Sequence, residues 1–517
     1  MQRSLHLGMS ARKGDMKMKK ILKITVGLLL VSLLFAVTLQ AQDSFWFGNP
    51  IAEFLDPNTI DAYHDFLEST VLPALQGPIM MPNNNPEDDQ GVTIYDPDRC
   101  WNGYTLLCSM GGHQSDPNGP VCSPILVDME GNLVKEWALG TFAVPMKMLP
   151  GGYVMGAIPG KGILVQLDWD GNVVWNSGLS YHHDYQREGN PVGYYAPGME
   201  ARVDGGKTLV LSNALPDPNL TTHISDFPLL DEMISEHDWE ANVLWQWKAW
   251  EHFEQMGFDD AAKDAIRTKF VQFMNPKATD YLHFNCASWL GPNKWYDQGD
   301  LRFHPDNIIF DGRSVNIIAI IARHDHPEGL WASGDIVWRV GPDYSAGHPE
   351  NKLGQIIGQH MAHMIPQGLP GAGNILLFDN GGMAGFGALV PGSSRGSYPN
   401  TLRDFSRVIE FDPVTLDLVW EWKQPSPTAD CDGDGDIKCE ERKFFSVFIS
   451  GAQRLENGNT MICEGATGRI FEVTSDGDIV WEYISPYTGG AKSPFKQRSV
   501  YRAYRVPASW LPQVAGN

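Results

Sequence analysis

The chain alternates between short apolar strand patterns and turns rich in glycine, asparagine and aspartate. Six times a turn is followed by a β-branched run that ends in tryptophan, and the Asp-Gly and Gly-Asn dipeptides in these turns supply the positive φ angles that two-residue hairpins need. The six runs end at Trp137, Trp175, Trp245, Trp338, Trp420 and Trp481. A second strand, turn and strand pattern precedes most of them. Four strands per repeat predict an all-β fold, a six-bladed β-propeller with inserted loops and a short helical insertion.

The two ends of the chain are expected to meet in one blade. The first tryptophan hairpin lacks a complete strand pair before it, whereas YRAYRVP at residues 501–507 matches the first strand of a blade. We therefore expect this segment to supply the innermost strand of the first blade and to close the ring, which removes an open sheet edge. The predicted organisation is a signal peptide (1–41), an irregular segment (42–98), the propeller (99–507) and a tail (508–517). The best helical pattern outside the signal covers residues 251–275.

The N-terminus predicts export. From Met16 a lysine-rich start leads into an apolar stretch and then to Ala41, a small residue at a plausible cleavage point. The apolar run is shorter than the roughly 20 residues of a spanning helix. We therefore expect a periplasmic or secreted protein with no stable membrane span after cleavage; an uncleaved anchor is the alternative.

Composition agrees with many short strands and turns, because the chain holds 53 Gly, 35 Pro and 17 Trp among 517 residues. A net charge of −23 without a Lys/Arg stripe beyond the N-terminus argues against nucleic acid as a partner. Seven cysteines in an exported chain make some disulfides expected, and the odd number leaves at least one thiol without a partner inside the chain.

An acidic run, DCDGDGDIKCEE, matches the twelve-residue EF-hand pattern, with Gly at its sixth position and Glu at its twelfth. The expected Ca²⁺ ligands are Asp430, Asp432, Asp434, Asp436 through its backbone, and Glu441. A strand pattern follows the run directly, so it predicts a structural Ca²⁺ loop between blades. A solvated acidic loop is the alternative.

Alignment of the innermost strands points to the chemistry of the channel. One equivalent position near the start of the strand is occupied by His360, His283, Val144, Gly198, Ser450 and Tyr501. In a propeller this end of the strand borders the central channel, so two of the six blades are expected to place an imidazole there.

Further polar residues are expected at the same rim. The second strand of a blade runs back to the rim where the first begins, which places Arg323 after NIIAIIA, and Asn380 after NILLF, beside the histidines. His182 and His183 are expected to enter the channel from a neighbouring blade. Several imidazoles with an arginine suit an oxyanion, which they can bind and attack. A metal site is the competing interpretation, but the charge of Arg323 opposes a bound cation.

At these residues the chain resembles the bacterial arylsulfotransferase family. The similarity covers roughly residues 100–507 and is carried by YHHD at 181–184, DYLHFN at 280–285, IIAR ending at Arg323, GQHMAHMIPQGLPGAGNILLFDNG at 358–381 and FISGAQRLENGNTMICEGATGRIFEV at 448–473. The resemblance implies a six-bladed propeller that moves a sulfuryl group from a phenolic sulfate ester to another phenol. It implies small-molecule aryl sulfates and phenols as partners and no nucleotide cofactor; a homodimer stays open.

The resemblance also implies roles for individual residues. The expected catalytic residues are His360 as the covalent histidine, His283, Arg323 and His183. The expected substrate-binding residues are His182, Asn285 and Asn380, and which member of the histidine pair faces the sulfate stays open. A neutral imidazole, with a reference pKa of about 6.5, is nucleophilic near pH 7 and could form a sulfohistidine. Met361 departs from the acidic residue expected after the covalent histidine.

Two other functions compete with the sulfotransferase. One is a non-catalytic propeller that binds sulfated or aromatic ligands, and the other is a calcium-dependent propeller hydrolase or lyase.

Overall fold

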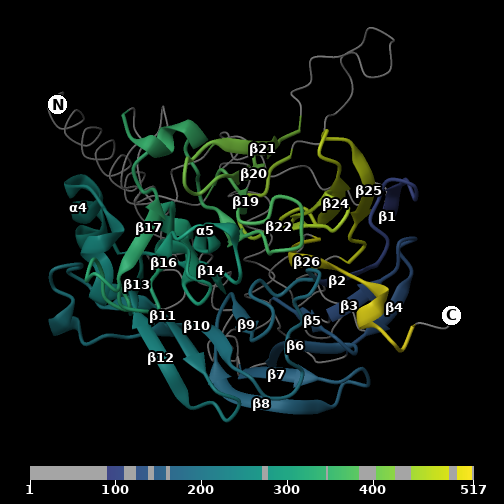
Figure 1. Cartoon of the computed structure of the whole chain (residues 1–517), viewed down its shortest axis with the longest axis horizontal. Coiled ribbons are helices and arrows are strands. Elements are labelled where there is room, and N and C mark those ends of the chain that lie inside the picture. Colours follow the sequence, from purple (N-terminus) through teal and green to yellow (C-terminus); the bar gives the residue numbers. More distant parts are fainter. Residues whose placement is uncertain are drawn as a thin grey trace, which may run out of the picture.

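The chain forms six antiparallel blades arranged around a central axis (Figure 1). The computed structural model describes residues 90–109, 124–137, 145–158, 163–270, 277–344, 347–382, 403, 405–424, 444–487 and 498–514. Within these residues strands dominate and helices are few and short, so the predicted six-bladed β-propeller is confirmed. The predicted signal peptide and the predicted calcium loop lie outside the described residues.

Each blade is numbered in chain order, and its strands are given from the central axis outward. Blade 1 consists of β26 (Val500–Val506), β2 (Tyr104–Ser109), β3 (Pro124–Val127) and β4 (Leu133–Glu136). Blade 2 consists of β5 (Lys147–Leu149), β6 (Tyr153–Ile158), β7 (Ile163–Leu167) and β8 (Val173–Ser180). Blade 3 consists of β9 (Tyr185–Arg187), β10 (Thr208–Ala214), β11 (Leu229–His237) and β12 (Val243–Lys248), with β13 (Thr279–Asp280) paired to β11.

The remaining blades repeat this order. Blade 4 consists of β14 (Phe284–Trp289), β15 (Ile308–Gly312), β16 (Ile317–Ile321) and β17 (Ile336–Val340). Blade 5 consists of β18 (His360–Met364), β19 (Ile375–Asp379), β20 (Arg407–Phe411) and β21 (Leu418–Trp422). Blade 6 consists of β22 (Gly451–Arg454), β23 (Thr460–Glu464), β24 (Arg469–Val473), β25 (Ile479–Ile484) and the added β1 (Gly91–Tyr95).

Short helices lie in the connections. They are η4 (Pro218–Leu220), η5 (Ala249–Met256), α4 (Asp260–Thr268), α5 (Lys294–Asp297), η6 (Leu301–Phe303), η7 (Arg313–Val315), η8 (Pro349–Leu353) and η9 (Ala508–Trp510). The segment expected to be one helix over 251–275 forms η5 and α4, which Gly257 at φ 75° separates. Both pack on the interface between blades 3 and 4, where Phe253 and Ile266 are buried.

Both chain ends extend the propeller. The C-terminal strand β26 pairs with β2 as the innermost strand of blade 1, which is the closure expected for YRAYRVP. Residues 91–95, placed by the sequence in an irregular segment, instead form β1 against the outer strand β25. The segment after β26 is also more ordered than a tail, because Trp510 is buried between blades 1 and 2.

Tryptophan side chains join each blade to the next. Their indole N–H groups donate to carbonyl oxygens in the outer turn of the following blade: Trp137 to Asp168 (3.2 Å), Trp175 to Trp239 (3.0 Å), Trp247 to Gly334 (2.8 Å), Trp338 to Pro413 (2.8 Å), Trp422 to Gly477 (3.1 Å) and Trp481 to Met129 (2.8 Å). The last bond returns from blade 6 to blade 1 and completes a circuit. In blades 3 and 5 the donors Trp247 and Trp422 stand two positions after the tryptophan that ends the sequence repeat, on the same strand face. In blade 5 the repeat tryptophan, Trp420, also donates, to the carbonyl oxygen of Ser475 (3.0 Å).

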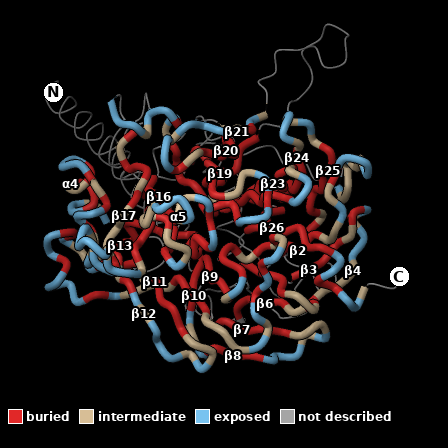
Figure 2. Tube along the Cα trace, in the orientation of Figure 1, coloured by how far each residue is buried: buried red, intermediate tan, exposed pale blue. Residues whose placement is uncertain are grey.

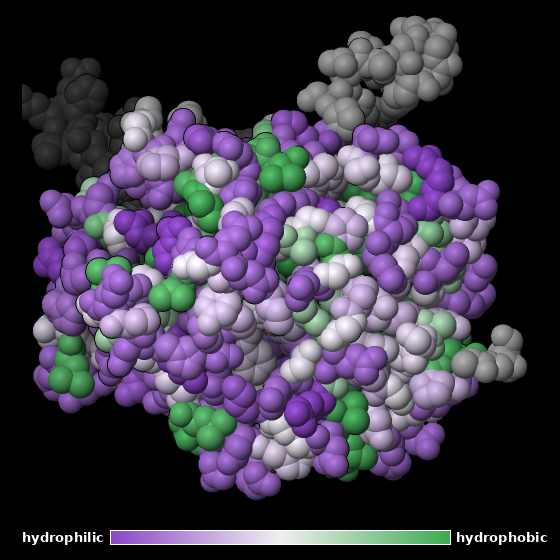
Figure 3. Space-filling model, in the orientation of Figure 1, coloured by the Kyte–Doolittle hydropathy of each residue, from purple (hydrophilic) through white to green (hydrophobic). Residues whose placement is uncertain are grey.

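Apolar side chains fill the interfaces between blades. Leu106 of blade 1 packs with Met148 of blade 2, and at the closure Leu107 packs with Val480 of blade 6. In Figure 2 the buried positions concentrate on the inner strands and the exposed positions on the outer turns. The face seen in Figure 3 is mainly hydrophilic with separate small apolar patches. Among the described residues, no helix has the length and apolarity needed to cross a membrane.

The circuit predicts a specific loss of stability in Trp481→Phe. This change keeps most of the apolar contact but leaves the Met129 carbonyl without its indole donor, which should lower the free energy of unfolding by about 1–3 kcal/mol. Trp331→Phe, at a half-buried position in the loop between β16 and β17, is the matched control and should change it by less than about 0.5 kcal/mol. Chemical denaturation followed by circular dichroism measures both; equal effects would contradict the role of the circuit.

Candidate active site

Histidines from three neighbouring blades meet at the start of their inner strands. His283 immediately precedes β14, His360 begins β18, and His182 and His183 lie just before β9. The sequence alignment placed Gly198 at this position of blade 3, but that was wrong. The inner strand of blade 3 is β9, and the long insertion lies between β9 and β10, so the histidine pair takes the place expected for glycine.

The histidines of blades 3 and 4 are in direct contact. Nδ1 of His182 lies 2.7 Å from Nδ1 of His183, and the rings of His183 and His283 lie 4.8 Å apart in an edge-on arrangement. Both His183 and His283 hold left-handed backbone conformations, with φ of 57° and 52°. Such conformations cost a non-glycine residue about 1 kcal/mol or more, and they are found where surrounding structure fixes a functional geometry.

Two buried carboxylates support these imidazoles. Oε2 of Glu232, on β11, lies 2.9 Å from Nε2 of His182, and Oδ2 of Asp280, on β13, lies 2.6 Å from Nδ1 of His283. Neither residue was singled out from the sequence. Asp280 lies three residues before His283 within DYLHFN, a spacing that could have suggested it; Glu232 had no local signal, because it arrives from another strand.

The arginine beside the histidines is Arg313, not Arg323. Arg313 begins η7 directly after β15, is buried, and donates its backbone N–H to the carbonyl oxygen of His283 (3.1 Å). Its charge contributes to the lowered pKa of His183, of His283 and of His360.

Arg323 lies at the other end of blade 4. It follows β16, which is the third strand of the blade and leads away from the histidines, because Gly312 pairs with Ile317 and Ile308 with Ile321. Its guanidinium is ion-paired with Glu236 at 2.7 Å. NIIAIIA was predicted to be the second strand of the blade but is the third, and neighbouring strands run in opposite directions, so Arg323 lies at the opposite rim.

Asn380 fixes the protonation of His360. The amide nitrogen of Asn380 donates to the carbonyls of Ser446 (2.7 Å) and Ile449 (2.8 Å), so its Oδ1 faces Nδ1 of His360 at 2.7 Å. The carbonyl of Gly358 lies 3.0 Å from the same Nδ1. Because both neighbours are acceptors, Nδ1 must carry the proton and Nε2 the lone pair.

The lone pair on Nε2 of His360 is already engaged. It accepts the backbone N–H of Ile449 at 3.1 Å, from a segment in which Ile449 and Ser450 have φ of 55° and 99°. Asn285, from the neighbouring blade, donates its side-chain amide to the carbonyl of Gln359 (3.0 Å) and so holds the residue before His360. His360 is therefore positioned by blades 4, 5 and 6 together.

Burial keeps the channel imidazoles neutral. Desolvation first, and then neighbouring positive or imidazole groups, lower the pKa of His183, His283 and His360 well below the usual 6.5. For His360 the bond to Asn380 works in the opposite direction and raises the pKa, but it is outweighed. All three side chains therefore stay unprotonated at neutral pH and keep a nitrogen lone pair.

The pKa values of the two supporting carboxyl groups are raised. Burial raises the pKa of Asp280 to about 6, although Arg313 and His182 pull it down. Burial also raises the pKa of Glu232, against the opposing effect of His182.

A second polar layer lies next to the histidines. Lys147 donates to Oδ1 of Asp184 at 2.6 Å, and Arg502 of β26 lies 3.4 Å from the other oxygen of Asp184 and donates to the carbonyl of Asn285 at 2.6 Å. This layer joins blades 1, 2, 3 and 4 across the axis. It adds positive charge on the axial side of the histidines, and the charge of Arg502 also lowers the pKa of His360.

The arrangement suits an anion that carries a transferable group. Neutral imidazoles with Arg313 offer hydrogen-bond donors and one fixed charge in a buried setting, where charge-assisted hydrogen bonds are strong. One imidazole, His360, holds its lone pair on Nε2 without needing a base to remove a proton, and this lone pair becomes available once the Ile449 N–H leaves it. The predicted residues His182, His183, His283, Asn285, His360 and Asn380 are thus brought together, and Arg323 is not.

A match to a family profile shows to which protein family the chain belongs. The arylsulfotransferase (ASST) profile matches residues 146–486, which is well over half of the chain and contains every residue of this histidine cluster. The chain belongs to the arylsulfotransferase family. Membership supports sulfotransferase activity in general and small-molecule aryl compounds as substrates. The chain has no match among curated proteins.

Some solved structures resemble this chain at low sequence identity. A protein of unknown function from Bacteroides caccae is 11% identical over 78% of this chain and 99% of its own, with a TM-score of 0.36. Virginiamycin B lyase from Staphylococcus aureus is 11% identical over 78% and 86%, with a TM-score of 0.30. The Dos1 propeller is 9% identical over 77% and 74%, with a TM-score of 0.30. None of these similarities bears on the chemistry.

The geometry predicts that inorganic sulfate binds beside Arg313. Arg313→Gln should weaken this binding by roughly 10- to 100-fold, because a charge-assisted hydrogen bond is worth about 1.5–3 kcal/mol. Arg323→Gln is the matched control and should leave it unchanged, since Arg323 lies at the opposite rim. Calorimetric titration with sulfate measures both variants. A loss confined to Arg323→Gln would contradict the placement.

Proposed function

We propose that the protein transfers a sulfuryl group from an aryl sulfate to a phenol through a sulfohistidine formed on His360. The observation that carries the proposal is the fixed tautomer of His360, with Nδ1 bonded to Asn380 and the lone pair on Nε2. Burial beside Arg313 keeps this imidazole neutral and nucleophilic without a separate base.

In the first step the Ile449 N–H leaves Nε2 of His360, and the freed lone pair attacks the sulfur of the aryl sulfate. The N–S bond forms while the S–O bond to the ring breaks, and the electron pair of that bond leaves on the phenolate oxygen. The sulfated imidazole ring becomes cationic. Its proton stays on Nδ1 and is donated in a hydrogen bond to Oδ1 of Asn380. Arg313 and the neighbouring imidazoles bind the sulfuryl oxygens, whose charge rises in the transition state.

The pair His182 and His183 is suited to handle the proton of the phenol. Glu232, His182 and His183 form a line of close contacts of 2.9 and 2.7 Å, which ends on the channel imidazole. A proton can shift along this line between the Glu232 carboxylate and Nε2 of His183. His183 therefore protonates the departing phenolate and later accepts the proton of the incoming phenol.

In the second step the deprotonated acceptor oxygen attacks sulfur. The new S–O bond forms, the N–S electron pair returns to Nε2 of His360, and the acceptor leaves as its sulfate ester. A phenolate is a good leaving group in both directions, so no nucleotide donor is needed. Export to the periplasm or outside the cell and the Ca²⁺ loop at 430–441 remain predictions.

Covalent catalysis predicts a burst. Rapid mixing with an aryl sulfate should release one phenol per active site before steady turnover, and the peptide that contains His360 should gain the mass of one acid-labile SO₃ group. His360→Asn should lose both the burst and the mass gain, while still binding sulfate through Arg313.

A burst and mass gain that persist in His360→Asn would place the nucleophile elsewhere. Sulfate-ester binding without turnover in the wild type would make the protein a binding propeller instead.

The pH dependence of the first step should reflect the lowered pKa of His360. A group whose folded-state pKa is lowered stays neutral to lower pH, so the burst rate should stay nearly flat from about pH 8 to about pH 6. An exposed imidazole would instead lose most of its nucleophilic form below pH 6.5. Stopped-flow bursts across this range test it, and a midpoint near 6.5 would contradict the assignment.

A further inference from the structure

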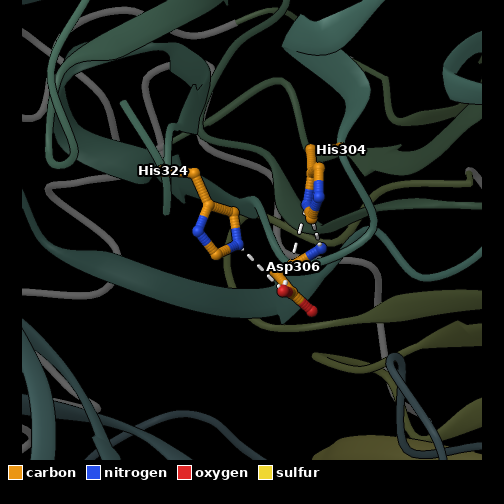
Figure 4. A group of neighbouring side chains, drawn as sticks. All are labelled: His304, Asp306 and His324. Carbon is orange, nitrogen blue, oxygen red and sulfur yellow. Dashed lines mark hydrogen bonds and ion pairs between the residues drawn. The ribbon is translucent and has the colours of Figure 1, made fainter. Parts of the chain in front are cut away.

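Three side chains gather at the rim of blade 4 opposite the histidine cluster. His304 follows η6, Asp306 lies in the turn before β15, and His324 follows β16 (Figure 4). The strand pairing fixes this location, because Ile308 and Ile321 are opposite each other at the end of the blade farthest from Phe284. The group is independent of the proposed sulfuryl transfer.

We propose that His304, Asp306 and His324 bind a divalent transition-metal ion, with zinc as the expected species. Their ligand atoms all lie within 4.8 Å of one another. Oδ2 of Asp306 lies 2.9 Å from Nε2 of His324 and 4.0 Å from Nδ1 of His304. Two ligands of a tetrahedral Zn²⁺ at about 2.0–2.2 Å lie about 3.3–3.6 Å apart, so binding would lengthen the first separation and shorten the second by about half an ångström each.

The nitrogen and oxygen atoms have the character that zinc requires. Nδ1 of His304 accepts the backbone N–H of Asp306 at 3.2 Å, so this nitrogen is unprotonated, and a metal bound through it would replace that hydrogen bond. The rings of His304 and His324 lie 4.6 Å apart at a steep angle of 67°, which lets both edges face Asp306 without stacking. Two imidazoles and one carboxylate favour zinc, copper or nickel over calcium or magnesium, which prefer oxygen ligands.

The surrounding contacts hold the two halves of the site together. Asn307 is buried, accepts the backbone N–H of Arg323 at 2.9 Å and donates to the carbonyl of Arg302 at 2.9 Å. It therefore anchors the residue before His324 beside the turn that carries Asp306. His304 is fixed from the other side by an edge-on contact with Tyr296, at 4.7 Å between ring centres.

The site is only partly buried, and this exposure determines how a metal would be coordinated. Side-chain exposure rises from 28% for His304 to 51% for Asp306 and 56% for His324, so water can complete the coordination. The positive charge of Lys207 interacts with Asp306 and opposes the binding of a metal cation there. We therefore expect the site to bind the metal with moderate affinity. A bound metal would join the turn before β15 to the end of β16, and would thus clamp the blade whose other rim carries His283 and Arg313.

The test is zinc titration of the metal-stripped full chain, with His324→Ala beside His326→Ala. His326 is the matched control, because it lies two residues further on and caps its own loop through the backbone of Glu328. Calorimetry should show one site that weakens by at least about tenfold in His324→Ala and not in His326→Ala. His324 is exposed, so folding should survive its loss, and circular dichroism checks this.

A second readout separates this site from the channel histidines. Zinc should raise the midpoint of thermal unfolding of the wild type and of His360→Asn alike, but not of His324→Ala. Equal zinc binding by all variants, binding lost only in a channel variant, or no binding at millimolar zinc would each overturn the proposal.

Discussion

The geometry of the molecule depends on the circuit of indole hydrogen bonds that runs from blade to blade. In every blade an outer tryptophan donates to a carbonyl in the turn of the next blade, and the last, Trp481, returns to Met129 in the first. Because each bond has a fixed length and a direction around the ring, the circuit sets the angle between neighbouring blades. The apolar clusters between blades then fill the space that this angle leaves, and β26 joins the two ends of the chain.

The geometry of the candidate active site depends on the arrangement of the blades in that ring. No blade holds it alone: Asn380 of blade 5 orients His360 while binding carbonyls of the segment that leads into blade 6. The imidazoles of blades 3 and 4 meet edge to face only because β9 and β14 are neighbours. Burial has a free-energy cost for the charged side chains at the axis, but it keeps the histidines neutral. A neutral imidazole beside a fixed arginine charge is what attack on an anionic ester requires.

Periodicity was enough to predict the architecture. The tryptophan repeats and the matching C-terminal strand led to six blades and a closed ring, because each blade repeats the same local chemistry. His283 and His360 could also be found, since they stand at a repeated position. Errors arose where insertions hid a strand: Arg323 was chosen because IIFDG before Arg313 was not recognised as the second strand of blade 4, and Gly198 was aligned because β9 has three residues.

Contacts between site residues that are far apart in the chain could not be predicted from the sequence. Glu232 reaches His182 from a strand fifty residues further along the chain, and the Ile449 N–H reaches His360 from another blade. The tautomer of His360 follows from contacts of this kind and not from any motif. Its chemistry could therefore be proposed only once the blades were in place.

The central claim is that the reacting group binds between His360 and Arg313 at the rim where the inner strands begin. The most direct test is a crystal structure of His360→Asn, which cannot form the sulfohistidine, grown with an aryl sulfate. The account predicts the sulfate ester within hydrogen-bonding distance of Arg313, His183 and His283, with its sulfur facing position 360. An ester bound at the opposite rim, beside Arg323, would contradict it.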